Sequence, residues 1–256
     1  MRKNNESNLI IYNKKMKKLI LLSAILILGC KNTNQIRITK VEGSTEYENA
    51  KLSLKEFSWT DEGYLFSFDL ENYKLGLQSP KEFEYKLANS AKGQHIHLIV
   101  NNGPYSAKYT EEFVHNQLDK TKGSDVVLAF LSRSYHESVK NKDAYFLTQI
   151  GDSIANKKDL SKELLFYSRP KGTYKADDTN RVLLDFYLIN TSLAEDGNKV
   201  RATIHGTEFI IDEWAPYYIE GLPKGEISIK LELINSKGDL IESPFNPSQR
   251  TFTLEE

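Results

Sequence analysis

The chain has little cysteine, methionine and tryptophan, and no large excess of either charge. One cysteine among 256 residues excludes an intrachain disulfide framework and any cysteine-based zinc site. With 34 basic and 35 acidic residues the formal net charge is −1, so the sequence carries no electrostatic footprint for nucleic acid. Charged residues make up 27% of the chain, near the average for folded proteins, which argues against a wholly disordered chain.

Common catalytic motifs are also missing. The chain has no nucleophile elbow (G-x-S-x-G), Walker loop, H-E-x-x-H or G-x-G-x-x-G pattern. Its carboxylate pairs, such as Glu111-Glu112 and Asp177-Asp178, lie in expected turns or strand edges, where solvated charges are commoner than an acid–base pair. We therefore predict a protein without enzymatic activity.

The first thirty residues have the pattern of a targeting signal. Met16, the expected translation start, and two lysines precede an apolar run at residues 19–28, and Gly29-Cys30 follows. About ten apolar residues cannot cross a hydrocarbon core that needs roughly twenty, so residues 1–29 are predicted to be a signal peptide. A lone cysteine after Ile-Leu-Gly resembles the lipobox of bacterial lipoproteins, which implies cleavage before Cys30 and acylation of its thiol and new amine. The alternative is an ordinary secretory signal with a chance cysteine.

Removal of this segment leaves a mildly acidic body. It carries 28 basic and 34 acidic residues, a net charge of −6. Such a body is not drawn to anionic lipid, so acyl chains at Cys30 would supply membrane attachment. Residues 30–36 read as a short polar tether. Lys31 stands where a retention signal has Asp, and this resemblance implies an outer-membrane lipoprotein of the bacterial cell envelope, facing the periplasm or the cell surface.

The rest of the chain is rich in strand-like alternation. Residues 64–70 place aromatic side chains on one face, residues 95–100 end in the turn sequence Asn-Asn-Gly-Pro, and residues 126–131 form a nearly continuous apolar run. Residues 227–233 alternate strictly. Fourteen Tyr and twelve Phe also favour pleated structure. The pattern predicts an all-β protein.

The strand patterns recur in one order along the chain. The similar pairs are residues 63–76 with 181–194 and residues 122–131 with 224–233. This internal echo predicts two tandem β-sandwich domains of the immunoglobulin or fibronectin type, at residues 37–150 and 160–256, joined by a linker at residues 151–159. One larger sandwich or barrel is the alternative.

Three histidines are candidates for a metal site. His95 and His97 lie two apart on an expected strand, so both rings project to the same face. His136 follows the next long apolar strand. If the two strands are neighbours, three imidazoles converge, which suits copper, zinc or nickel, with Glu137 or water completing the shell. The alternative is that the pair on the strand is exposed or hydrogen-bonded. The remaining histidines are expected to be structural or exposed: His115 and His205.

The loop around His136 also suits an anion. Within seven residues it supplies hydroxyls, a guanidinium and an imidazole, the donors that a phosphate needs. These candidate ligand-binding residues are Ser132, Arg133, Ser134, His136 and Ser138. Lys140 and Lys142 add positive potential, and Arg169 repeats the Ser-Arg pair near the expected domain junction. The alternative is a solvated loop whose arginine pairs with a nearby carboxylate.

Two segments resemble a known group of proteins. GQHIHLIVNNGPYSA (residues 93–107) and LAFLSRSYHESVKN (residues 128–141) look like small bacterial envelope lipoproteins that are labelled phosphopeptide-binding proteins. The label echoes the forkhead-associated domain, whose loop reads Ser-Arg-x-His. Here two residues separate Ser132-Arg133 from His136. The paired-histidine strand also resembles a domain whose first strand begins His-x-His-Leu, which favours a metal.

Together these features predict a lipid-anchored, non-catalytic binding protein whose partner is a phosphorylated or anionic peptide, or another envelope protein. The first alternative is an envelope lipoprotein that binds copper or zinc. The second is an accessory structural lipoprotein with an aromatic contact surface at residues 214–218. Metal-assisted hydrolysis would require an open metal position, with Glu137 as the base.

Overall fold

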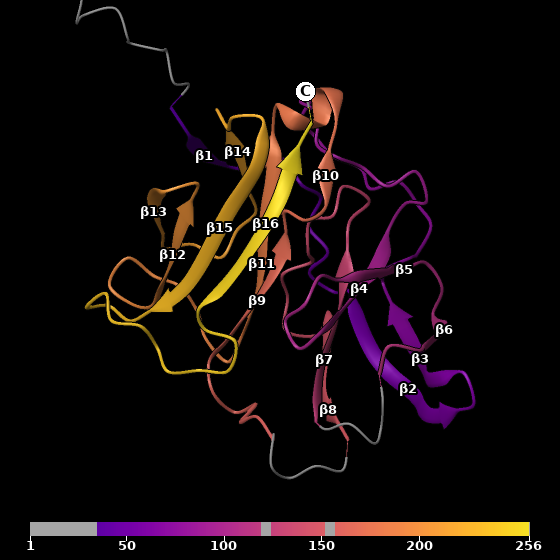
Figure 1. The fold of residues 1–256 in the computed structure, drawn as a ribbon. Helices are drawn as coiled ribbons and strands as arrows, with labels where there is room; N and C mark the ends of the chain where they lie inside the picture. The colour runs from indigo at the N-terminus through magenta and orange to yellow at the C-terminus, as the bar shows by residue number, and fades with distance from the viewer. Residues whose placement is uncertain (1–34, 119–123, 152–156, 256) are drawn as a thin grey trace, which may run out of the picture. The chain divides into compact units, whose positions relative to one another are not determined.

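The computed structural model describes residues 35–118, 124–151 and 157–255, which are organised into β-sheets (Figure 1). The predicted signal peptide, the acylated Cys30 and most of the tether lie outside the described residues, as do residues 152–156 of the predicted linker. Among the residues described, no helix is long and apolar enough to cross a membrane. A short 3₁₀ helix, η2 (Ala176–Thr179), is present.

The first half of the chain contributes two antiparallel sheets, with strand orders β2-β3-β6 and β5-β4-β7-β8. Their bounds are β2 (Lys51–Thr60), β3 (Gly63–Glu71), β4 (His95–Val100), β5 (Ser106–Lys108), β6 (Glu112–His115), β7 (Asp125–Ser132) and β8 (Tyr145–Ile150). Apolar side chains of the facing sides, such as Phe66 and Phe68 of β3 and Leu98 of β4, are buried together as the core of a sandwich.

The second half forms two further sheets, with orders β1-β14-β11-β9 and β10-β16-β15-β12-β13, in which only the β10–β16 pair is parallel among the described strands. Their bounds are β1 (Arg37–Lys40), β9 (Leu164–Arg169), β10 (Thr173–Tyr174), β11 (Val182–Ile189), β12 (Lys199–Ile204), β13 (Thr207–Ile211), β14 (Tyr217–Glu220), β15 (Gly225–Ile234) and β16 (Ser248–Leu254). A second core lies between these two sheets.

The predicted fold class, all-β with sandwich architecture, is confirmed. The segments that echo one another in sequence become strands in the interior of their sheets: β3 and β11 form one pair, β7 and β15 the other. β1, which opens the predicted first domain, pairs instead with β14 of the second half. The described residues belong to one compact unit, and the division at residues 37–150 and 160–256 stays a prediction.

Strands β4 and β7 are buried on both of their faces. Val127, Ala129 and Leu131 of β7 belong to the first core, whereas Val126, Leu128 and Phe130 join a separate cluster. That cluster also contains four residues of the second half: Leu164 and Phe166 of β9, and Tyr187 and Ile189 of β11. A strand covered on two sides needs apolar residues on both, which explains the unbroken apolar run of β7. The sheet β5-β4-β7-β8 therefore packs between one sheet of each half.

Candidate functional site

His95 and His97 lie on the face of β4 that is turned toward the second half. Their neighbours on the strand, Ile96 and Leu98, point into the first core, while Ile99 joins the cluster shared with β9 and β11. Because side chains alternate along a strand, both histidines share the face of Ile99. Neither ring has any solvent exposure. The strand period thus places two imidazoles inside the layer between the two halves.

His136 reaches the same place from a tight turn after β7. The turn closes with the His136 N–H donating to the Arg133 carbonyl at 2.9 Å, and with the Arg133 N–H donating to the Glu137 carbonyl at 2.8 Å. His136 has φ of 70°, in the left-handed region that residues with a side chain seldom adopt. Such strain concentrates at functional positions, since the surrounding structure must hold it in place.

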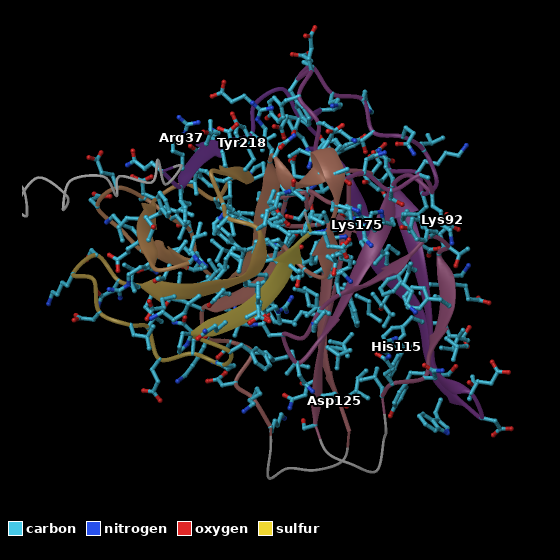
Figure 2. All side chains as sticks on the ribbon, turned by 45° about the horizontal axis from the view of Figure 1, so that its top comes forward. Arg37, Lys92, His115, Asp125, Lys175 and Tyr218 are labelled. Carbon is cyan, nitrogen blue, oxygen red and sulfur yellow. The ribbon has the colours of Figure 1, made fainter. Side chains whose placement is uncertain are left out.

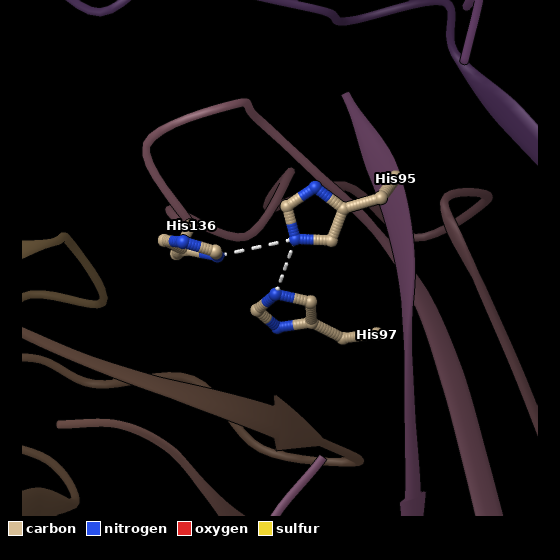
Figure 3. Close-up of side chains that lie close together, drawn as sticks. All are labelled: His95, His97 and His136. Carbon is tan, nitrogen blue, oxygen red and sulfur yellow. Dashed lines mark hydrogen bonds between the residues drawn. The ribbon is translucent and has the colours of Figure 1, made fainter. Parts of the chain in front are cut away.

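The three rings converge on one point (Figure 3). His95 Nε2 lies 2.9 Å from His97 Nε2 and 3.2 Å from His136 Nδ1. One ring nitrogen from each residue lies within 4.8 Å of the others. The pairing of β4 with β7 makes this possible, because His95 is opposite Ser132 and the His136 turn begins directly after it. The structure therefore brings together the histidines that the sequence singled out.

Hydrogen bonds to neighbouring groups show which ring nitrogen of His95 carries the proton. His95 Nδ1 lies 2.8 Å from the Gly93 carbonyl, which only accepts, so Nδ1 carries the proton and Nε2 offers its lone pair to the centre. Ser168 Oγ of β9 lies 3.4 Å from His97 Nδ1. Polar neighbours of this kind orient imidazoles that bind metals, by fixing the tautomer and the ring plane.

Burial keeps all three imidazoles neutral. Desolvation lowers the pKa of His95 from 6.5 to about 4 and is the largest cause, while the nearby Arg169 charge lowers it further. Desolvation likewise lowers the pKa of His97 and of His136, with neighbouring histidines and Arg169 as further causes. At neutral pH the site therefore presents three unprotonated nitrogens, the form that binds a metal ion.

The spacing of the nitrogens fits shared coordination. A metal–imidazole bond is about 2.0–2.1 Å long, so two nitrogens on one ion lie roughly 2.9–4.2 Å apart for angles between 90° and 180°. The 2.9 and 3.2 Å separations from His95 Nε2 fall in that interval. Imidazole ligands suit zinc and copper. Without a metal, His97 in its Nε2–H tautomer can donate to His95 Nε2 at 2.9 Å.

The residues proposed from sequence for an anion do not gather at this point, apart from His136. Arg133 Nη1 pairs with the Glu137 carboxylate at 2.8 Å and also donates to the Ser138 carbonyl, and Arg133 Nη2 donates to the Thr45 carbonyl at 2.6 Å. Arg133 and Glu137 are almost completely buried. The guanidinium therefore stabilises the turn that carries His136, and the Glu137 carboxylate pairs with Arg133 and accepts a hydrogen bond from Ser44.

The three serines of that set are also buried and hydrogen-bonded within the protein. Ser132 Oγ donates to the Arg133 carbonyl, Ser134 Oγ accepts from the Ser79 N–H, and Ser138 Oγ donates to Asp185 of β11 at 2.9 Å. A cleft of about 450 Å³ lies beside Arg133 and Glu137, and its rim carries both signs of charge, including Lys140 and Glu213. The charges that could recognise an anion are thus partly neutralised by acidic neighbours.

The other candidates from sequence lie elsewhere. His115, labelled in Figure 2, is buried on β6, and His205 is an exposed turn residue between β12 and β13. Trp214 donates its indole N–H to the Phe186 carbonyl at 3.0 Å and packs edge-on against Tyr187. Most of its ring is therefore used in internal packing, which leaves less of it for a partner.

Two residues that complete the histidine site were not singled out from the sequence: Tyr105 and Ser168. Tyr105 stacks on His97 with ring centroids 3.5 Å apart and a plane angle of 10°. The sequence places Tyr105 after a turn and Ser168 on a strand of the other half, so only the packing of β9 against β4 reveals their part. The repeated Ser-Arg pair at Ser168-Arg169 was the available signal.

We expect Arg133→Ala to lower the free energy of unfolding by about 3–5 kcal/mol, because the substitution leaves Glu137 buried without its partner. Denaturant unfolding would measure the loss. The matched control is the double variant Arg133→Met with Glu137→Gln, which removes both charges and should be more stable than Arg133→Ala. A free energy for Arg133→Ala within about 1 kcal/mol of the wild type would contradict the structural role.

Metal-free protein should lose stability as the pH falls from about 6.5 toward 4. The pKa of each histidine is lower in the folded state, so the unfolded chain binds more protons in this interval. The stabilising contribution is complete above pH 6.5 and declines below it. A triple variant with Gln at residues 95, 97 and 136 should show a shallower decline, measured by urea unfolding in chelator across the interval. An identical slope in both proteins would rule out this contribution.

Comparisons with known proteins add little. No protein-family model matches the sequence, and no curated protein matches it. Among solved structures, the chain is similar to the central fibronectin-III array of RIM-binding protein, with 13% identity over 84% of this chain and 71% of that one and a TM-score of 0.26. It is also similar to the fibronectin(III)-like modules of Clostridium thermocellum CbhA, with 10% identity over 86% and 94% and a TM-score of 0.28. The fold class therefore follows from the sheets of this chain and not from these similarities.

Proposed function

We propose that this protein is a non-catalytic metal-binding protein of the bacterial cell envelope, with His95, His97 and His136 as ligands of one copper or zinc ion. The observation that carries the proposal is the convergence of three neutral imidazole nitrogens, from two buried histidines and one half-buried histidine, within 4.8 Å. Three imidazoles that meet, with no carboxylate in their cluster among the residues the structure describes, are the donor set expected for such an ion.

Binding of a phosphorylated or anionic peptide, the first expectation from the sequence, has weaker support. Arg133 was its central residue, and all three guanidinium nitrogens hydrogen-bond to Thr45, Glu137 and Ser138. A phosphate would have to compete with a buried ion pair for the same nitrogens. We therefore favour the metal over the peptide as the ligand.

We expect purified protein without a His tag to bind one equivalent of Cu(II) or Zn(II), measured by elemental analysis after reconstitution and by calorimetry. Substituting Gln for any one of the three histidines should weaken affinity at least tenfold, because each ligand supplies one of few metal bonds. Metal should also raise the melting temperature of the wild type, and a chelator should reverse the rise.

The matched controls are His115→Gln and His205→Gln, which change a histidine outside the cluster and should leave both stoichiometry and affinity unchanged. Absence of stoichiometric metal in the wild type would end the proposal. Equal affinity in a variant that lacks all three cluster histidines would do the same.

The envelope location rests on the lipobox-like sequence that ends at Cys30. Attachment through acyl chains would hold the β-sandwiches at a membrane surface without a spanning segment. Expressed in a bacterial host, the full chain should incorporate labelled palmitate into the membrane fraction, and Cys30→Ser should abolish this because it removes the only thiol. Labelling that persists in Cys30→Ser would show that the anchor has been misassigned.

A further inference from the structure

Tyr105 contacts two of the three histidines of the cluster. Its ring stacks on His97, and its hydroxyl lies 3.2 Å from His136 Nδ1, the same atom that lies 3.2 Å from His95 Nε2. Tyr105 is 3% exposed. A phenol oxygen is therefore fixed at the edge of the metal site, within the spacing that two ligands of one ion show.

The lone pair of His136 Nδ1 can serve the phenol proton or a metal ion, but not both. In the metal-free protein the Tyr105 hydroxyl can donate to that nitrogen at 3.2 Å. A metal on Nδ1 removes the acceptor. The buried hydroxyl then has to find another acceptor or give up its proton, and an unmade hydrogen bond at a buried polar group is costly.

Two cations lie beside the Tyr105 ring. Lys171 Nζ is 3.9 Å from the ring centroid, and the Arg169 guanidinium carbon is 5.3 Å from it. Within the described part of the chain, neither residue forms an ion pair with a carboxylate. Arg169 Nη1 donates to the Tyr174 hydroxyl, Lys171 Nζ donates to the Tyr105 carbonyl, and Arg169 Nε is buried with no partner. Burial raises the pKa of Tyr105 and the Arg169 charge lowers it only in part, so a bound metal ion would have to supply the further positive charge that stabilises a phenolate.

We propose that the Tyr105 oxygen is the fourth ligand of the metal ion and binds as a phenolate, with Arg169 and Lys171 beside its ring. The inference rests on the proposed metal site. When the ion binds, the O–H bond breaks, the metal–oxygen bond forms and the proton leaves to solvent, with no change in oxidation state. One ligand thereby fills the fourth coordination position and adds a negative charge next to two cations.

A site of three imidazoles and one phenolate is closed. Four protein ligands are typical of metal sites that hold an ion in place, whereas catalytic zinc sites keep a position for water or substrate. A phenolate also adds a hard, anionic oxygen to the nitrogens, which suits Cu(II) better than Cu(I). The chemistry assigned to Tyr105 therefore agrees with a protein that binds a metal without turning over a substrate.

The test uses Cu(II) as the probe, because a copper-bound phenolate gives a charge-transfer absorption band in the visible region. Wild-type protein loaded with one Cu(II) should show this band. Tyr105→Phe keeps the ring that stacks on His97 but removes the oxygen, so it should still bind one copper, with affinity reduced at least tenfold, and should lose the band. Its electron paramagnetic resonance spectrum should shift with the change of ligand.

The matched control is Tyr109→Phe. The Tyr109 ring lies 5.0 Å from that of His95, but its hydroxyl is hydrogen-bonded to Ser90, so copper affinity, band and resonance spectrum should all be retained. Failure of the wild type to bind copper would overturn the metal site itself. Stoichiometric copper without the band, or a band that survives Tyr105→Phe, would overturn only the role of Tyr105. Azide provides a further test of the role of Tyr105. If azide shifts the spectrum of the wild type but not that of Arg169→Gln, an external anion holds the fourth position and the role of Tyr105 is overturned.

Discussion

The burial of β4 and β7 on both faces is the constraint on which the rest of the site depends. One face of each strand fills the first sandwich, and the other packs against β9 and β11 of the second half. A polar side chain placed on that second face cannot reach water. His95 and His97 occupy such positions, so their chemistry is decided by the few polar groups that the packing brings within reach.

Desolvation is the largest influence on the pKa of each of the three histidines. No carboxylate joins the three histidines in the described structure, and the nearest charges, Arg169 and Lys171, are positive. Both influences disfavour the imidazolium form. The rings are therefore held as neutral donors with their nitrogens close together. Geometry and electrostatics thus both suit the proposed metal ion.

Part of this arrangement was accessible from the sequence. The period of two along His95–His97 fixes a common face, and the turn after residues 126–131 fixes the approximate place of His136. From the sequence, these two strands could only be assumed to be neighbours, and β4 does pair with β7, in antiparallel orientation. What the pattern could not supply is contact between halves. Ser168 lies 71 residues from His97 in sequence, and only tertiary packing brings Ser168 and Arg169 to the histidines.

The Arg133 turn shows what local composition could not reveal to the anion prediction. Hydroxyls and a guanidinium within seven residues look like a phosphate cradle, but in a buried turn the same groups are needed to satisfy one another and the backbone. The position of β1 has a similar cause. Its partner, β14, lies about 180 residues away in sequence, and no periodicity in a four-residue strand can identify such a partner.

Unequal access to the three rings has a kinetic consequence. His95 and His97 are sealed within the layer, while His136 retains partial exposure on its turn. An ion entering or leaving would have to pass the side where His136 stands, and the turn there is pinned by the Arg133–Glu137 pair and closed by two backbone hydrogen bonds. The lifetime of a bound ion would then depend on how often the turn that carries His136 opens. Exchange of the ion would be slow even for a site of ordinary affinity.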